Sequence, residues 1–191
     1  MKKVFMVLSL AAFVATGAKA QTSMEYGVKA GVNFSTAKGE SSSSSGSISA
    51  SGTGFLVGVY TAFALSDAIK IQPELLYDNY NFKKESTSNL NYLSIPILGK
   101  YAFKNIGLSV LAGPQIGFLL SAKDGSMDIK NDFKSINIGL AVGAEYSLPA
   151  GFNVSARYNA GLSNIQKSPT DGSSTKLSAF TIAVGYNLSK K

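Results

Sequence analysis

The chain has 191 residues, enough for one domain with a sizeable core, and contains neither Cys nor His. Their absence excludes disulfides, the usual zinc sites and catalysis by Ser-His-Asp, Cys-His or Asp-His groups. The formal charge is +7. Without Lys2, Lys3 and Lys19, a modest excess of 15 basic over 11 acidic residues remains. These basic residues are scattered, which argues against a nucleic-acid partner.

The first twenty residues have the pattern of a signal peptide. Two lysines precede an apolar run from Val4 to Ala15, and Ala18-Lys19-Ala20 forms a small-x-small cleavage site. The run is too short to cross a bilayer as a helix. We therefore predict a signal peptide over residues 1–20, cleavage between Ala20 and Gln21, and a single domain over residues 21–191. The alternative is a buried N-terminal helix.

Beyond Gln21, apolar and polar residues alternate with a period of two, which indicates β-strands. The alternation is clearest from Phe152 to Ser163. Soluble strands average about five or six residues, whereas strands that cross a membrane need about nine to eleven. Eight long segments are expected: Glu25–Ser35, Thr53–Leu65, Ile69–Phe82, Asn89–Phe103, Ile106–Ser121, Phe133–Leu148, Gly151–Ile165 and Thr175–Leu188.

The connections between these segments alternate in length. Thr36–Gly52, Ala122–Asp132 and Gln166–Ser174 are long, whereas Ser66–Ala68, Lys104-Asn105 and Pro149-Ala150 are short. Transmembrane barrels show this asymmetry, with short periplasmic turns and longer outside loops. An even number of strands also places both termini on the periplasmic side. The serine run from Ser41 to Ser45 has an alternative interpretation as an interdomain linker.

The polar face of the strands is unlike a surface in contact with water. It consists mostly of Gly, Ser, Asn and Ala, and only 15% of the chain is charged. Small residues suit the crowded interior of an eight-stranded barrel. The sequence therefore predicts an all-β fold, an eight-stranded antiparallel up-and-down transmembrane β-barrel with its apolar face outside.

A few charged residues also fall on this inner face, with both signs on separate strands. We expect Lys29, Glu74, Lys100, Glu145 and Arg157 to pair in the lumen, because a buried charge without a partner is costly. The network is interpreted as structural packing or as a closed or gated polar interior. A third possibility, a Glu74–Glu145 pair acting on a glycoside, is disfavoured by the basic neighbours.

Three prolines fall within expected strands, where each costs a ladder hydrogen bond. We expect bulges or local breaks at Pro73, Pro96 and Pro114.

Five motifs in order make the mature chain resemble the PorT-like outer-membrane β-barrel family, a group of small porin-type proteins. They are Gly27-Val28-Lys29-Ala30-Gly31-Val32-Asn33, Gln72-Pro73-Glu74-Leu75-Leu76-Tyr77, Tyr92-Leu93-Ser94-Ile95-Pro96-Ile97-Leu98, Ala112-Gly113-Pro114 and Arg157-Tyr158-Asn159-Ala160-Gly161-Leu162-Ser163-Asn164-Ile165. The resemblance implies an eight-stranded outer-membrane barrel with no single activity common to the group. It also has a proline at each of the three positions above.

The sequence favours an integral outer-membrane barrel with a structural, surface-interaction or weak permeability role, without catalysis. Its expected partners are outer-membrane lipids, the barrel assembly machinery and an extracellular ligand at the long loops, and no cofactor is expected. The alternative is a soluble periplasmic or secreted barrel that binds a small apolar ligand. A third hypothesis, an enzyme of the cell envelope, is disfavoured because the chain has no His and no Cys.

Overall fold

The computed structural model describes residues 24–40, 47–83, 87–103, 105–167 and 174–189. The predicted signal peptide and its cleavage site at Ala20 and Gln21 lie outside these residues. No helix among the described residues is both long and apolar enough to cross a membrane.

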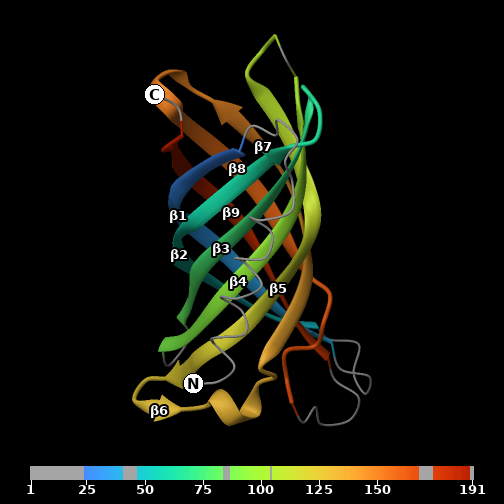
Figure 1. Ribbon diagram of the computed structural model, residues 1–191. Coiled ribbons are helices and arrows are strands. Elements are labelled where there is room, and N and C mark those ends of the chain that lie inside the picture. The colour runs from blue at the N-terminus through green and yellow to red at the C-terminus, as the bar shows by residue number, and fades with distance from the viewer. Residues whose placement is uncertain (1–23, 41–46, 84–86, 104, 168–173, 190–191) are drawn as a thin grey trace, which may run out of the picture.

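Eight long strands form the structure, and a ninth has only two residues (Figure 1). The long strands are β1 (Met24–Glu40), β2 (Ser47–Ala64), β3 (Ile69–Lys83), β4 (Thr87–Ala102), β5 (Leu108–Asp124), β7 (Ile136–Ser147), β8 (Phe152–Gly161) and β9 (Ser174–Asn187). The short elements are β6 (Met127–Asp128) and two 3-10 turns, η1 (Lys130–Asp132) and η2 (Pro149–Gly151).

The long strands close into an antiparallel up-and-down barrel, as predicted. Each pairs with the next along the chain, and β1 pairs with β9 to close the ring. Gly27 lies opposite Asn187, so the first strand begins where the last one ends. The short turns share that end of the barrel, whereas β6 and η1 lie at the other, which we call the long-loop end (Figure 1).

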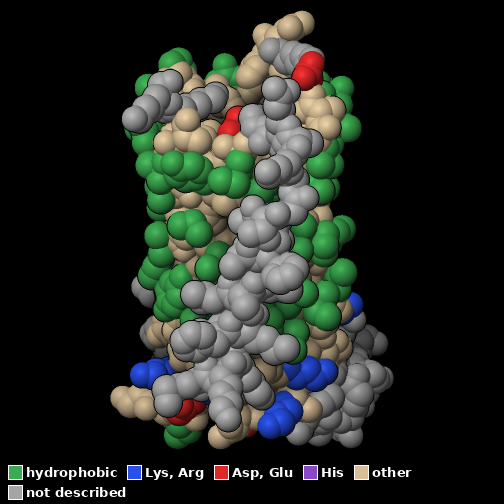
Figure 2. Space-filling model, viewed as in Figure 1, with side chains coloured by type: hydrophobic (Ala, Val, Ile, Leu, Met, Phe, Trp, Pro, Cys, Tyr) green, Lys and Arg blue, Asp and Glu red, His purple; other side chains and the backbone are tan. Residues whose placement is uncertain are grey.

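The apolar face points outward, which is the reverse of a water-soluble barrel. In β7, Ile136, Ile138, Leu140 and Val142 are each about half exposed, while Glu145 on the opposite face is 3% exposed. Hydrophobic side chains cover the barrel wall between its two ends (Figure 2). A wall of this kind suits lipid, because it would leave a large continuous apolar surface in water.

Several strand ends differ from the sequence prediction. The prediction of a loop over Thr36–Gly52 is wrong for most of that segment. Strands β1 and β2 stay paired from Thr36 opposite Ser51 to Glu40 opposite Ser47. Backbone pairing needs no apolar side chains, so the hairpin extends beyond the alternating pattern. Conversely, β8 ends at Gly161, four residues before the predicted Ile165. After Gly161 the chain no longer pairs with β7 as a strand, and Gln166 forms an isolated β-bridge with Phe133 at the barrel mouth.

The three prolines interrupt the ladder without shifting it. Pairing with the preceding strand is missing at Pro73, Pro96 and Pro114, and resumes in the same register on either side. The expected local breaks are therefore present, because proline has no N–H to donate. The expected bulges are not: the one register shift in these three ladders lies between Asn91 and Tyr92.

Candidate functional site

The lumen is the first candidate site, and the structure places all five residues of the predicted charge network inside it. Lys29, Glu74, Lys100, Glu145 and Arg157 come from β1, β3, β4, β7 and β8 respectively, and each is at most 8% exposed. Their positions alternate with outward apolar residues, so the pleat of each strand directs the charge inward.

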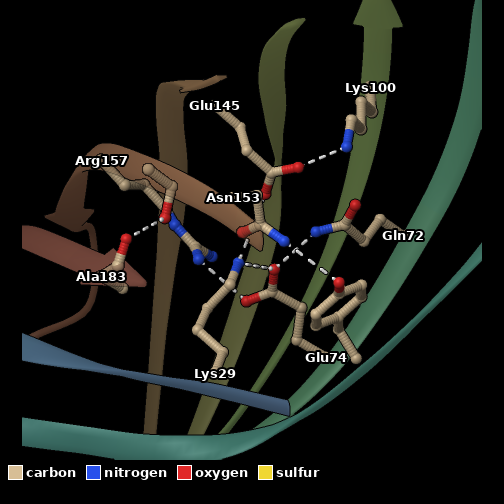
Figure 3. Close-up of polar contacts among 10 residues, drawn as sticks. Lys29, Gln72, Glu74, Lys100, Glu145, Asn153, Arg157 and Ala183 are labelled. Atoms are coloured by element: carbon tan, nitrogen blue, oxygen red, sulfur yellow. Dashed lines mark hydrogen bonds and ion pairs between the residues drawn. The ribbon is translucent and has the colours of Figure 1, made fainter. Parts of the chain in front are cut away.

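Glu74 is the centre of one half of the network. Lys29 Nζ lies 2.8 Å from Glu74 Oε1, and Arg157 Nη2 lies 2.9 Å from Oε2 (Figure 3). Gln72 Nε2 also donates to Oε1, at 2.9 Å. Cations from β1 and β8 therefore meet on one carboxylate of β3, across the lumen.

Glu145 is the centre of the other half. Lys100 Nζ donates to Glu145 Oε1, and Lys29 Nζ lies 3.8 Å from Oε2 (Figure 3). Lys29 thus joins the halves, and the order Lys100, Glu145, Lys29, Glu74, Arg157 alternates in sign. Alternation offsets the cost of burying charge, because each ion has an opposite neighbour.

Neutral polar side chains complete the network, and the sequence analysis did not identify their roles. Asn33 Nδ2 donates to Asp78 Oδ1 at 3.2 Å, and Thr181 Oγ1 donates to Asn33 Oδ1 at 2.8 Å. Including Asp78, three acidic and three basic side chains of the described residues are buried in the interior. In the sequence, the alternation of each strand indicates that these side chains point inward, but it does not indicate which of them are in contact.

Tyr60 contributes an aromatic ring beside these charges. Its hydroxyl accepts a hydrogen bond from Asn153 Nδ2 at 3.1 Å, and Lys29 Nζ lies 5.4 Å from its ring centroid. That distance permits a cation–π interaction. Gly27 leaves the space for this ring, since a Cβ there would come within 2.6 Å of it.

An apolar plug fills the lumen towards the long-loop end, a feature that the expected interior of mostly Gly, Ser, Asn and Ala did not include. Tyr80 and Tyr92 pack edge to face with centroids 6.1 Å apart. The plug consists of Tyr80, Phe82, Leu90, Tyr92, Leu119, Ala122, Ile165, Leu177 and Ala179, all buried. Neighbouring glycines leave room for these rings, since a Cβ at Gly117 would lie 3.3 Å from Tyr92 and one at Gly52 would lie 2.9 Å from Phe82.

Beyond the plug, the barrel mouth opens into a hollow of about 600 Å³, here called the vestibule. Its walls include Phe82, Leu90, Ile129, Phe133 and Ile165, with Asp124 and Gln166 among its polar residues. By contrast, the hollows near the charge network and beside Tyr80 measure only about 80 and 20 Å³. The lumen is therefore closed in its middle and open at its long-loop mouth.

The two central carboxylates of the lumen both have basic partners. Glu74 and Glu145, the carboxylate pair considered for glycoside hydrolysis, are each held by basic side chains. Among the described residues, no group of three His, Cys, Asp or Glu side chains could hold a metal ion.

Known proteins resemble this barrel in fold. The solved structure of Neisserial surface protein A has a TM-score of 0.54 and 18% identity, covering 84% of this chain and 96% of that one. Ail, the attachment invasion locus protein of Yersinia pestis, solved in complex with the heparin analogue sucrose octasulfate, has a TM-score of 0.53 and 14% identity, covering 86% and 99%. The outer membrane protein OprG from Pseudomonas aeruginosa gives 0.51 and 12%, covering 90% and 99%.

The sequence itself matches a family as well. No curated protein is significantly similar to the chain. Residues 19–167, most of its length, match the outer membrane protein beta-barrel domain, and the match supports a location in the outer membrane. Fold, outward apolar wall and sequence agree, and the chain belongs to the outer membrane protein beta-barrel domain family.

Proposed function

We propose that the protein is a non-conducting outer-membrane barrel with a structural or surface-interaction role at its long-loop end. The filled lumen carries this proposal. A charge network crosses its middle and the apolar plug lies beyond it, so no water-filled path of useful width remains. Eight strands enclose only enough space for side chains, which agrees with a closed interior.

The proposed orientation puts both termini in the periplasm and the vestibule outside the cell. The short turns, the start of β1 and the end of β9 lie at the same end of the barrel, as in bacterial transmembrane barrels. Delivery there would depend on the predicted signal peptide, residues 1–20, and on the barrel assembly machinery. Within the family, the five ordered motifs support assignment to the PorT-like group.

The vestibule is the proposed place of surface interaction. Apolar residues line a hollow of about 600 Å³, within the usual range for ligand sites. Ail has a similar fold and binds a heparin analogue in its solved structure, so such a barrel can carry a ligand. The proposed partner here is an extracellular ligand held at the mouth.

The other two functions have less support. A soluble barrel for an apolar ligand would carry its apolar face inside, whereas here that face is exposed. For an enzyme, catalysis through His or Cys is excluded because the chain has neither, and the central lumen carboxylates are paired with cations.

Conductance across a planar lipid bilayer tests the closed lumen. The mature chain, residues 21–191, would be refolded in micelles, and a gel band that shifts only after boiling would establish the folded barrel. We expect insertion without stable ohmic current steps. Reproducible steps from protein with that shift would contradict the closed lumen and favour a permeability role.

A further inference from the structure

Another hollow lies on the outer wall of the barrel, away from the lumen. Its volume is about 640 Å³, and it spans the wall from β8 through β9, β1 and β2 to β3 towards the long-loop end. Phe34, Tyr158 and Phe180 line it together with several hydroxyl side chains and Lys38. Neither the charge network nor the vestibule accounts for this combination.

The strand register arranges these side chains in three rows. Phe34 lies opposite Phe180, which in turn lies opposite Tyr158, and this is the aromatic row. Two residues nearer the long-loop end, Thr36 lies opposite both Ser178 and Ser51, forming the hydroxyl row.

Lys38 and Lys176 form the third row, two residues further along the same strands. Successive rows are separated by roughly 7 Å, because a strand rises about 3.4 Å per residue. Along the barrel axis the wall therefore changes from aromatic to hydroxyl to cationic. The chemistry of a lipid changes in the same order, from acyl chain through a polar linking group to phosphate.

The lysine row contains a repulsion that a bound anion would relieve. Lys38 and Lys176 are direct cross-strand partners on the outer face, and both side chains are exposed. Like charges in that position destabilise a sheet. Neither ammonium group forms an ion pair with a carboxylate whose position the structure describes. With Cβ atoms about 5 Å apart, the two ammonium groups are suitably placed to flank one phosphate.

We propose that this outer surface binds the phosphorylated headgroup of a lipid in the surrounding leaflet. Lys38 and Lys176 hold the phosphate, the hydroxyl row donates to the polar linking group, and the aromatic row contacts the first part of the acyl chains. The proposal rests on the membrane-embedded barrel proposed above, although it does not depend on whether the lumen conducts.

The concentration of positive charge at this end is consistent with that ligand. Lysine side chains gather at the long-loop end in Figure 2, beneath the hydrophobic wall. Described lysines there include Lys123, Lys130, Lys134 and Lys167. A leaflet that carries phosphate groups would face these lysines, and each lysine near such a surface adds to the electrostatic attraction between protein and lipid.

Lipid binding in neutral micelles is the test, with lipid A carrying both phosphates as the probe. Native mass spectrometry would measure the lipid-bound fraction for the refolded mature chain and for the double variant Lys38→Gln/Lys176→Gln. We expect the variant to bind roughly 30-fold more weakly, because this is the attraction that two lysines contribute near an anionic lipid surface. Lys38→Arg/Lys176→Arg, which keeps both charges, should restore binding.

The matched control is Lys123→Gln/Lys167→Gln, which removes two exposed lysines from the same end of the barrel. This control should bind lipid A within about threefold of the wild type, because it leaves the three-row surface intact. An equal loss in both double variants would overturn the site in favour of diffuse attraction. Millimolar inorganic phosphate should not displace the lipid; displacement would identify a free-phosphate site instead.

Thermal melting in lipid-free micelles provides a second readout. Lys38→Gln/Lys176→Gln should melt at the same temperature as the wild type or higher, since it removes a repulsion. Lipid A should raise the melting temperature of the wild type more than that of the variant. Equal rises would contradict the proposal even where the barrel is folded and non-conducting, so its failure is distinguishable from failure of the proposed function.

Discussion

At the scale of single residues, Glu74 is the side chain whose loss should cost most. Lys29 and Arg157 both lie within 3 Å of its carboxylate oxygens, and all three are buried. Glu74→Gln would leave two buried cations short of a partner, a change that costs about 3–5 kcal/mol. Urea unfolding in micelles would measure the loss.

The pair formed by Glu25 and Lys70 supplies the matched control. Its atoms are 2.7 Å apart, but the side chains are 23% and 20% exposed near the short-turn end. Glu25→Gln should therefore cost below about 1 kcal/mol, as for pairs near water. Equal losses in Glu25→Gln and Glu74→Gln would show that the central network does not stabilise the barrel.

The sequence indicated the five charged members of the network but not their contacts. Strand alternation places Lys29 and Glu74 on the inner face, yet it does not determine their height along the barrel. Height depends on the stagger between strands, which no local pattern records. For this reason Asn33 and Thr181, 148 residues apart, were not recognised as partners.

At the scale of elements, the tight turn between β7 and β8 depends on one glycine. Gly151 has φ of 86°, in the left-handed region, and a Cβ there would lie 3.2 Å from Asn187 O. Gly151→Ala should destabilise the barrel by about 1–2 kcal/mol, measured by unfolding in micelles. The control Gly99→Ala, where the nearest atom would be 3.6 Å away, should change stability by less than half as much. No difference between the two would contradict a strained turn.

The sequence predicted which segments form strands better than it predicted the residues at which those strands begin and end. Alternation over a membrane-crossing length identified all eight long strands, because only side chains facing lipid must be apolar. Beyond that length the constraint disappears, so the pairing of β1 and β2 up to Glu40 and Ser47 carried no signal. The two-residue β6 is likewise too short to show a period.

At the scale of the whole molecule, the barrel reverses the arrangement of a water-soluble protein, with ion-paired charges in its interior and an apolar exterior. This inversion explains the low charge of the sequence and the glycines on the inner face. The apolar plug was missed because its residues lie on different strands and resemble lipid-facing residues in type. Only closure of the ring brings Leu90, Leu119 and Leu177 into one buried cluster.

Lipid exposure of the outer wall tests this inversion most directly. Since the chain has no native Cys, single cysteines at Ile138, Leu140, Val142 and Tyr146 in β7 would each carry one spin label in phosphatidylcholine vesicles. We predict that dissolved oxygen, which partitions into lipid, relaxes the labels more strongly than a water-soluble nickel complex. The preference should be largest at Leu140 and Val142 and smaller at Tyr146, nearer the end of the strand. Labels relaxed mainly by the nickel complex at all four positions would mean that this face meets water, and would contradict a membrane-spanning barrel.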